Sequence, residues 1–227
     1  MTSTQLHAIG GISEAPLLNK YRFSLEWADA ALMDELIGRM RAESRQTMNL
    51  RTGVNPKLLV CRHQGDPVGW AGLDVETNPE YPELFSLYLY PEFRRYTIGL
   101  LLETARWRYL ASLGIDKAYG RMELATNFRL LRYRLSTGLF ERKERGDFPE
   151  PWADRCHGCE LFGNECTQQT YIAIDVKRAL ASGESRIGPI DVDDLPRDFV
   201  IRADTMRSKP RKVADEDQKQ RYRPYWL

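Results

Sequence analysis

The spacing of apolar and polar residues predicts strands and a helix along the first half of the chain. Apolar and polar residues alternate over 21–27, which is typical of a half-buried strand. Over 28–45 the apolar residues recur every three or four positions and predict a helix with one buried face. The runs 57–63 and 68–75 predict two strands that a short glycine-containing turn joins as a hairpin.

The stretch 84–113 is the centre of the predicted fold. Its apolar and aromatic first part has strand length and ends at Pro91. A basic turn with a single glycine, Gly99, follows, and an apolar-periodic segment then predicts a helix that reaches Leu113. The first N–H groups of a helix have no acceptor within the helix, and the helix dipole favours negative charge there. The stretch therefore predicts a site for a phosphate or pyrophosphate.

The pattern beyond residue 113 predicts one more helix and three more strands. The strands are expected over 117–124, 139–144 and 171–176, and the helix over 127–136. Beyond 178 the chain is charged, contains prolines and is only weakly periodic. The expected parts are a lead-in over 1–19, a folded domain over 20–178 with a cysteine-rich insertion over 146–168, and a C-terminal extension over 179–227.

The composition favours a soluble globular protein. Of the 227 residues 42% are hydrophobic, and no apolar run reaches the length of about 18 residues that a membrane helix needs. Lys and Arg number 33 against 32 Asp and Glu, so the formal charge of +1 gives no nucleic-acid footprint. The first residues lack the charged-then-apolar pattern of a signal peptide, so we expect a cytoplasmic protein.

Two segments carry a resemblance to a known family. In Leu89–Gly99 (LYPEFRRYTIG) Arg94 and Gly99 match the first and last positions of an Arg/Gln-x-x-Gly-x-Gly/Ala loop, and Thr97 stands where that loop usually has its first glycine. The segment 127–140, NFRLLRYRLSTGLF, is similar to an asparagine-led helix that ends in Gly-Phe, although one residue separates the two here. With the order of the predicted elements, these segments resemble the GCN5-related N-acetyltransferase (GNAT) family over residues 20–178.

The resemblance implies a mixed α/β fold, of α+β character, in which helices flank a central mixed and mostly antiparallel sheet. It implies an N-acyltransferase that moves an acetyl group from acetyl-CoA to a primary amine by direct attack on the thioester. The backbone N–H near Leu89 would polarise the thioester carbonyl, which is stabilisation of the oxyanion type. The residues that the resemblance assigns to coenzyme A are Leu89, Arg94, Arg95, Tyr96, Thr97, Ile98, Gly99, Leu100 and Asn127.

Proton transfer in this family commonly uses a carboxylate or an ordered water as base and a tyrosine as acid. Glu83 and Glu123 are the candidate bases, because each lies beside a strand that would border the cleft; the alternative for each is a solvated carboxylate. The tyrosine is expected seven residues after the helix asparagine, where this chain has Arg134, and Tyr133 lies one residue earlier. Because one residue turns a helical side chain by about 100°, Tyr133 is either the acid or a residue packed on the buried side of its helix.

Three of the four cysteines lie close together and predict a structural metal site. Cys156, Cys159 and Cys166 have the spacing C-x2-C-x6-C, which suits tetrahedral zinc. The candidates for the fourth ligand are His157, Cys61 and His63. An iron–sulfur cluster is an alternative, as are three reduced thiols in a surface loop. The insertion falls between the last two strands, where we expect it to shape the acceptor pocket.

The sequence also allows three other functions. A non-catalytic binding module on the same fold would use the metal loop and the extension as interaction surfaces. An acyltransferase could use a longer chain or a carrier-protein thioester. A toxin-like enzyme would act on aminoacyl-tRNA, which the lack of net positive charge argues against. The acceptor is expected to be a small-molecule or peptide amine, and the extension could wrap its own domain, form a homodimer or bind a protein partner.

Overall fold

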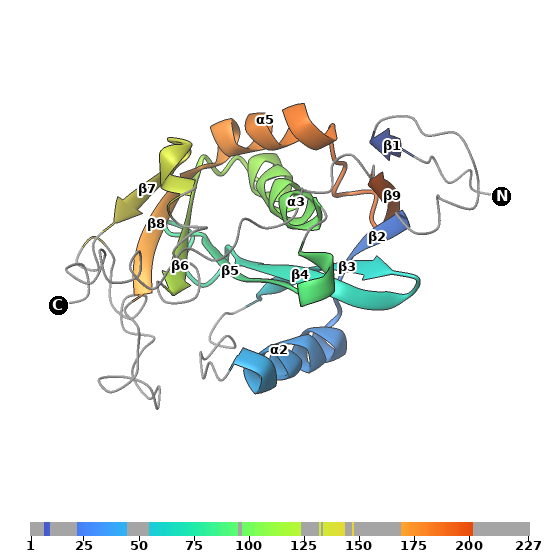
Figure 1. Cartoon of the computed structure of the whole chain (residues 1–227). Coiled ribbons are helices and arrows are strands. Elements are labelled where there is room, and N and C mark those ends of the chain that lie inside the picture. The colour runs from blue at the N-terminus through green and yellow to red at the C-terminus, as the bar shows by residue number, and fades with distance from the viewer. Residues whose placement is uncertain are drawn as a thin grey trace, which may run out of the picture.

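The computed structural model describes residues 7–9, 22–44, 55–94, 97–123, 132, 134–143, 147 and 169–201. These residues form a nine-stranded sheet in the order β1-β9-β2-β3-β4-β5-β6-β8-β7 (Figure 1). The strands are β1 (His7–Ile9), β2 (Arg22–Trp27), β3 (Lys57–His63), β4 (Asp66–Asp74), β5 (Glu83–Leu89), β6 (Lys117–Glu123), β7 (Phe140–Lys143), β8 (Gln169–Asp175) and β9 (Arg197–Ile201).

The sheet is mixed and mostly antiparallel, as the family resemblance implies. Only the neighbours β1–β9 and β5–β6 run parallel among the described strands. The strands predicted over 21–27, 57–63 and 84–90 agree with β2, β3 and β5 to within one residue at each end. The agreement follows from the alternation over 21–27 and, for the other two runs, from a strand length that turn or loop residues limit.

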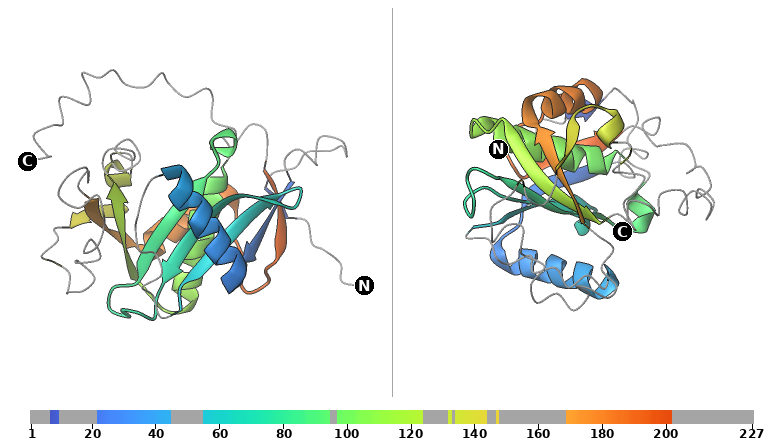
Figure 2. Two further views of the ribbon diagram at one scale, coloured as in Figure 1. Left: turned by 90° about the horizontal axis from the view of Figure 1, so that it is seen from below. Right: turned by 90° about the vertical axis from the view of Figure 1, so that its left-hand side faces the viewer.

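Helices cover both faces of the sheet. They are α2 (Ala30–Ser44), the short 3-10 turn η2 (Pro91–Phe93), α3 (Ile98–Ser112) and α5 (Val176–Ile187). Figure 2 shows α2 crossing the face made by β3, β4 and β5, where its residues Leu36 and Ile37 pack on Trp70 and Phe85. On the other face α3 lies between the sheet and α5 (Figure 1). Within the described ranges, no helix combines the length and the apolar character that crossing a membrane requires.

Helix α3 is the buried helix of the fold. Leu101, Leu102 and Ala105 pack towards the sheet, and Thr104 contacts α5 at Gly183. Because the sheet covers one side of α3 and α5 covers the other, little of the helix faces solvent. Apolar residues therefore occur on most of its surface instead of on one stripe.

The part of the chain beyond residue 176 is more regular than the sequence analysis expects. Val176 begins α5 instead of ending the preceding strand, and Asp175 caps the helix by accepting a hydrogen bond from the Arg178 N–H at 3.0 Å. The prediction of weak periodicity is wrong for this segment, since Val176, Ala179, Leu180, Gly183 and Ile187 form one buried stripe. Farther on, β9 pairs with β2, so residues 179–201 pack on the same sheet.

Candidate active site

A gap between β5 and β6 is the central feature of the candidate site. The two strands pair only at Glu83↔Tyr119 and Leu84↔Gly120, although β5 continues to Leu89. A bulge in the β4–β5 ladder lies just beyond the last of these pairs, where Ser86 has a positive φ of 49°. A bulge bends and twists its strand, which moves β5 away from its parallel neighbour.

The backbone of Leu89 faces this gap. Tyr90 donates its N–H to the carbonyl of Val68 on β4 at 3.1 Å, and Leu89 lies opposite Gly69. In an antiparallel ladder this pattern marks a non-hydrogen-bonded pair, so the N–H and C=O of Leu89 point away from β4 and towards the gap. Arg94 Nε donates to the Leu89 carbonyl at 2.9 Å. The N–H of Leu89 therefore points into the gap between β5 and β6.

The start of α3 lies beside the end of β5. Leu101 donates its N–H to the Thr97 carbonyl at 2.9 Å and closes the first turn, so the N–H groups of Ile98, Gly99 and Leu100 have no acceptor within the helix. Thr97 has φ −75°, which any residue adopts, so its Cβ is compatible with the loop. A Cβ at Gly99 would lie 3.4 Å from Leu89 Cδ1, an ordinary contact. The protein itself does not require a glycine there, whereas a phosphate that approaches the backbone closely would.

Two carboxylates lie opposite each other at the end of the gap where β5 and β6 are still paired. Glu83 and Asp74 are paired across β5 and β4, are both 3% exposed, and share the α2 side of the sheet with Phe85. Asp74 accepts hydrogen bonds from the N–H groups of Glu76 and Thr77 and from the Thr77 hydroxyl, so it fixes the following loop. Of the pair, Glu83 is on the strand that borders the gap and remains the candidate base.

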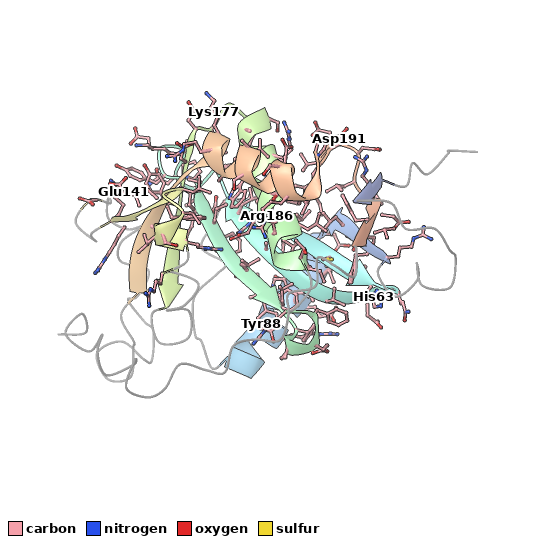
Figure 3. All side chains as sticks on the ribbon, turned by 45° about the horizontal axis from the view of Figure 1, so that its top comes forward. His63, Tyr88, Glu141, Lys177, Arg186 and Asp191 are labelled. Carbon is pink, nitrogen blue, oxygen red and sulfur yellow. The ribbon has the colours of Figure 1, made fainter. Side chains whose placement is uncertain are left out.

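The structure adds features that the sequence analysis did not single out. Tyr88 stacks on Trp70 with ring centroids 4.7 Å apart, and Tyr90 meets Tyr88 edge-on at 5.6 Å. Figure 3 shows Tyr88 beside η2, at the end of the sheet where the gap opens. On the α3 side, Arg106 is 2% exposed in the middle of an apolar helix. In the sequence, Arg106 could have been noticed only as a charged residue within the mostly apolar segment that forms α3.

Several predicted site residues lie outside the described residues. These are Arg95, Tyr96, Asn127 and Tyr133 of the cofactor and acid assignments, and Cys156, His157, Cys159 and Cys166 of the metal assignment. Glu123 is the last residue of β6 and pairs with Gln169. No group of metal-ligating side chains is present in the ranges that the structure describes.

Cys61 does not fit the metal site for which it is a candidate. Its side chain is fully buried in the core beside Phe23, Leu59 and Val68, and burial raises the pKa of its thiol. A metal ligand must be a thiolate, which this apolar environment disfavours. His63 has its Nδ1 2.9 Å from the Arg22 carbonyl and lies against the Phe23 ring.

A hollow of about 440 Å³ lies away from the gap, between β2, β9 and the β3–β4 turn. It is lined by two arginines, each of which already has an acidic partner: Arg22 pairs with Asp198, and Arg62 pairs with Glu26 at 2.6 Å. We therefore place the candidate chemistry at the β5–β6 gap.

The comparisons with known proteins give structural neighbours only. The structure is similar to GNAT-family acetyltransferases. An acetyltransferase of the GNAT family from Staphylococcus aureus has a TM-score of 0.49 and 15% identity, over 68% of this chain and 99% of its own. The IAA acetyltransferase from Bacillus cereus has a TM-score of 0.49 and 15% identity, over 67% of this chain and 99% of its own. The N-acetylglutamate synthase from Neisseria gonorrhoeae, complexed with coenzyme A and N-acetyl-glutamate, has a TM-score of 0.48 and 13% identity. The match covers 67% of this chain and 35% of the synthase. No protein-family model and no curated protein matches the sequence.

Proposed function

We propose that this protein is an N-acyltransferase that transfers an acetyl group from acetyl-CoA to a primary amine. The observation that carries the proposal is the Leu89 backbone turned into the β5–β6 gap directly beside the start of α3. One end of the sheet thus combines a donor for a carbonyl oxygen with N–H groups for a pyrophosphate.

Each part of coenzyme A has a counterpart in this geometry. The N–H groups of Ile98, Gly99 and Leu100 would bind the pyrophosphate at the positive end of the helix dipole. The pantetheine arm would enter the gap and use the edge of β5 that β6 leaves unpaired. The N–H of Leu89 would donate to the thioester oxygen, and Leu87, which strand alternation turns the same way, is a second donor of this kind.

Transfer needs a neutral amine, and Glu83 is the group that we propose to accept its proton. The amine nitrogen attacks the carbonyl carbon and forms the C–N bond, while the C–S bond breaks and leaves its electron pair on sulfur. Glu83 lies six residues, about 20 Å, along β5 from Leu89, so the amine proton would reach it through a chain of several waters. Glu83 lies on the α2 side of the sheet, so the acceptor would approach the gap from that side.

From the sequence we also propose that Cys156, Cys159 and Cys166 bind a structural zinc ion. Thiolate ligands at this spacing suit tetrahedral zinc, and a metal would restrict the conformations of an insertion of this length. In this proposal the metal shapes the acceptor side and takes no part in acyl transfer.

The test is acetyl-CoA binding followed by a transfer assay. Calorimetry of the full chain with acetyl-CoA should give heat with one site per chain. Mass spectrometry should then detect an acetyl group on at least one of three probes: a small primary amine, a peptide with a free N-terminus, or a lysine-containing peptide. Binding without transfer to any of them would favour the non-catalytic module, and no binding at all would refute the cofactor site.

A further inference from the structure

Strand β5 contains one residue more than β4 at the point where the gap opens. Trp70 is paired with Tyr88, and the next pair is Gly72 with Phe85. Two steps along β4 therefore lie opposite three steps along β5. Ser86, with its positive φ of 49°, is part of this interval. The extra residue interrupts the ladder of hydrogen bonds and leaves backbone groups there without their usual partners.

Arg106 of α3 satisfies two backbone carbonyls at this bulge. Its Nη1 donates to the carbonyl of Gly72 at 2.8 Å and to the carbonyl of Phe85 at 3.3 Å. These carbonyls belong to the last pair before the extra residue, one on each strand. Because a buried carbonyl needs a hydrogen-bond donor, one nitrogen of Arg106 supports both strands where their own ladder is interrupted.

The bulge is also enclosed from the other face of the sheet. The Phe85 ring packs with Leu36 and Ile37 of α2, and it lies so close over Gly72 that a Cβ at residue 72 would overlap it. Arg106 approaches from α3, on the opposite face (Figure 1). The bulge is therefore held between an aromatic ring on one face and a guanidinium group on the other.

Packing of α3 on the sheet does not by itself explain an arginine at this position. Arg106 is buried, and burial lowers its pKa to about 9, so the guanidinium group is still charged at neutral pH. Its Nη2 is 3.9 Å from Glu103 Oε1, and its Nε has no hydrogen-bond partner in the part of the chain that the structure describes. A buried cation with an unused donor is less favourable than an apolar side chain would be. The two carbonyls of the bulge are what the guanidinium group serves.

Two contacts fix α3 along the part of β5 that borders the gap. At one end a Cβ on Gly99 would be 3.4 Å from Leu89 Cδ1, and at the other Arg106 binds the Phe85 carbonyl. The two helix residues are seven apart, about 10.5 Å along the helix axis, and the two strand residues are four apart, about 13 Å along β5. Because these lengths are similar, α3 runs back along the strand in the opposite direction.

We propose that Arg106 is a positioning residue for acyl transfer. By holding the bulge, it sets the distance between the start of α3, where the pyrophosphate would bind, and the N–H of Leu89, which would polarise the thioester. The inference rests on the proposed function, and Arg106 acts through the strand without contact with either substrate. A misplacement of about 1 Å between reacting groups can slow a reaction by about 100-fold, so the support of the bulge matters for the rate.

The experiment measures the infrared band of the acetyl carbonyl in bound acetyl-CoA, identified by isotope labelling of that carbonyl. A hydrogen bond to the oxygen weakens the C=O bond and lowers the frequency of the band. In Arg106→Met the band should therefore lie at higher frequency than in the wild-type complex, and kcat should fall about 100-fold. The affinity for coenzyme A should change little, because the helix start that binds the pyrophosphate is intact.

Arg108 provides the matched control on the same helix. It forms an ion pair with Glu184 of α5, and its Nε is 3.1 Å from Glu184 Oε1. Arg108→Met should lower the stability to denaturant but leave the carbonyl band and kcat as in wild type. Arg106→Lys keeps the charge and a donor nitrogen on a shorter side chain, so its band and kcat should be intermediate. This variant carries the test where Arg106→Met fails to fold.

The outcomes separate the inference from the proposed function. A wild-type band or a wild-type kcat in a folded Arg106 variant overturns the positioning role alone, as does an equal shift of the band in Arg108→Met. Loss of coenzyme A affinity in a folded Arg106 variant also overturns it, because Arg106 would then act in cofactor binding. Failure of the wild-type protein to bind acetyl-CoA, or to acetylate any amine probe, overturns the proposed function and, with it, the positioning role.

Discussion

The Leu89 side chain lies directly over Gly69 of β4, so that a Cβ at residue 69 would stand 2.2 Å from Leu89 Cδ2 and 2.9 Å from the Tyr88 carbonyl oxygen. Leu89 also contacts the start of α3 at Gly99. Two glycines on different elements thus set the position of the one residue whose backbone we propose to polarise the thioester.

Gly69→Ala should move Leu89 and impair catalysis more than stability. The side chain of Leu89 can shift but the Tyr88 carbonyl belongs to the paired strand, so we expect a loss of about 1–3 kcal/mol in the free energy of unfolding. The rate of transfer should fall further, because the N–H of Leu89 moves with the strand. Denaturant unfolding and initial rates are the measurements.

The matched control is Gly38→Ala on α2. A Cβ there meets nothing within 4 Å, and alanine favours the helix by about 0.5–1 kcal/mol. A Gly69→Ala protein that unfolds and transfers acetyl groups as wild type does would contradict the position assigned to Leu89.

Gly99→Ala should separate cofactor binding from folding. The added Cβ fits beside Leu89, so the free energy of unfolding should change by no more than about 0.5 kcal/mol. The pyrophosphate would be pushed away from the helix N-terminus, and losing one hydrogen bond to a charged group should weaken acetyl-CoA binding about tenfold or more. Calorimetry measures the affinity. Unchanged affinity would mean that the phosphates do not approach the backbone at this residue.

Glu83→Gln tests the proposed base. The substitution preserves shape but cannot accept the amine proton, so kcat should fall by about 10²–10⁴-fold while acetyl-CoA affinity stays the same. The control is Glu80→Gln, an exposed residue in the loop before β5, which should leave both constants unchanged. If Glu83→Gln retains its kcat, a water or another group takes the proton.

Cys159→Ser should lower the metal content of the purified protein, and Cys61→Ala should not. The first removes a proposed zinc ligand, whereas the second removes a thiol that is enclosed in the core. Elemental analysis gives the zinc content, expected at about one ion per chain. Full zinc content in Cys159→Ser would refute the ligand assignment, and loss of zinc in Cys61→Ala would show that Cys61 is a ligand despite its burial.

The order of the main strands and helices could be predicted because it depends on local periodicity. The alternation over 21–27 predicts a strand, and the apolar stretch 84–113 predicts a strand and a helix, from residues that are close in sequence. The candidate cofactor loop could be predicted for the same reason, since Arg94, Thr97 and Gly99 are close in sequence. Helix α5 is not predicted: its apolar residues recur at helical spacing, but the charged and proline-containing sequence around them hides the pattern.

The chain alone predicts most of the strands and helices and an anion site at the start of one helix, because strands, turns and helix ends are local. Only the tertiary structure decided where that site lies and what surrounds it. The separation of β5 from β6 depends on a bulge and on a parallel pairing between residues that are 36 apart in the sequence, Leu84 and Gly120. Glu103 of α3 forms ion pairs with Arg106 of the same helix and with Arg134 of the segment before β7, and no spacing rule connects Arg134 to α3. Burial arises when distant segments pack, so the enclosure of Glu83, Arg106 and Cys61 appears only in the folded chain.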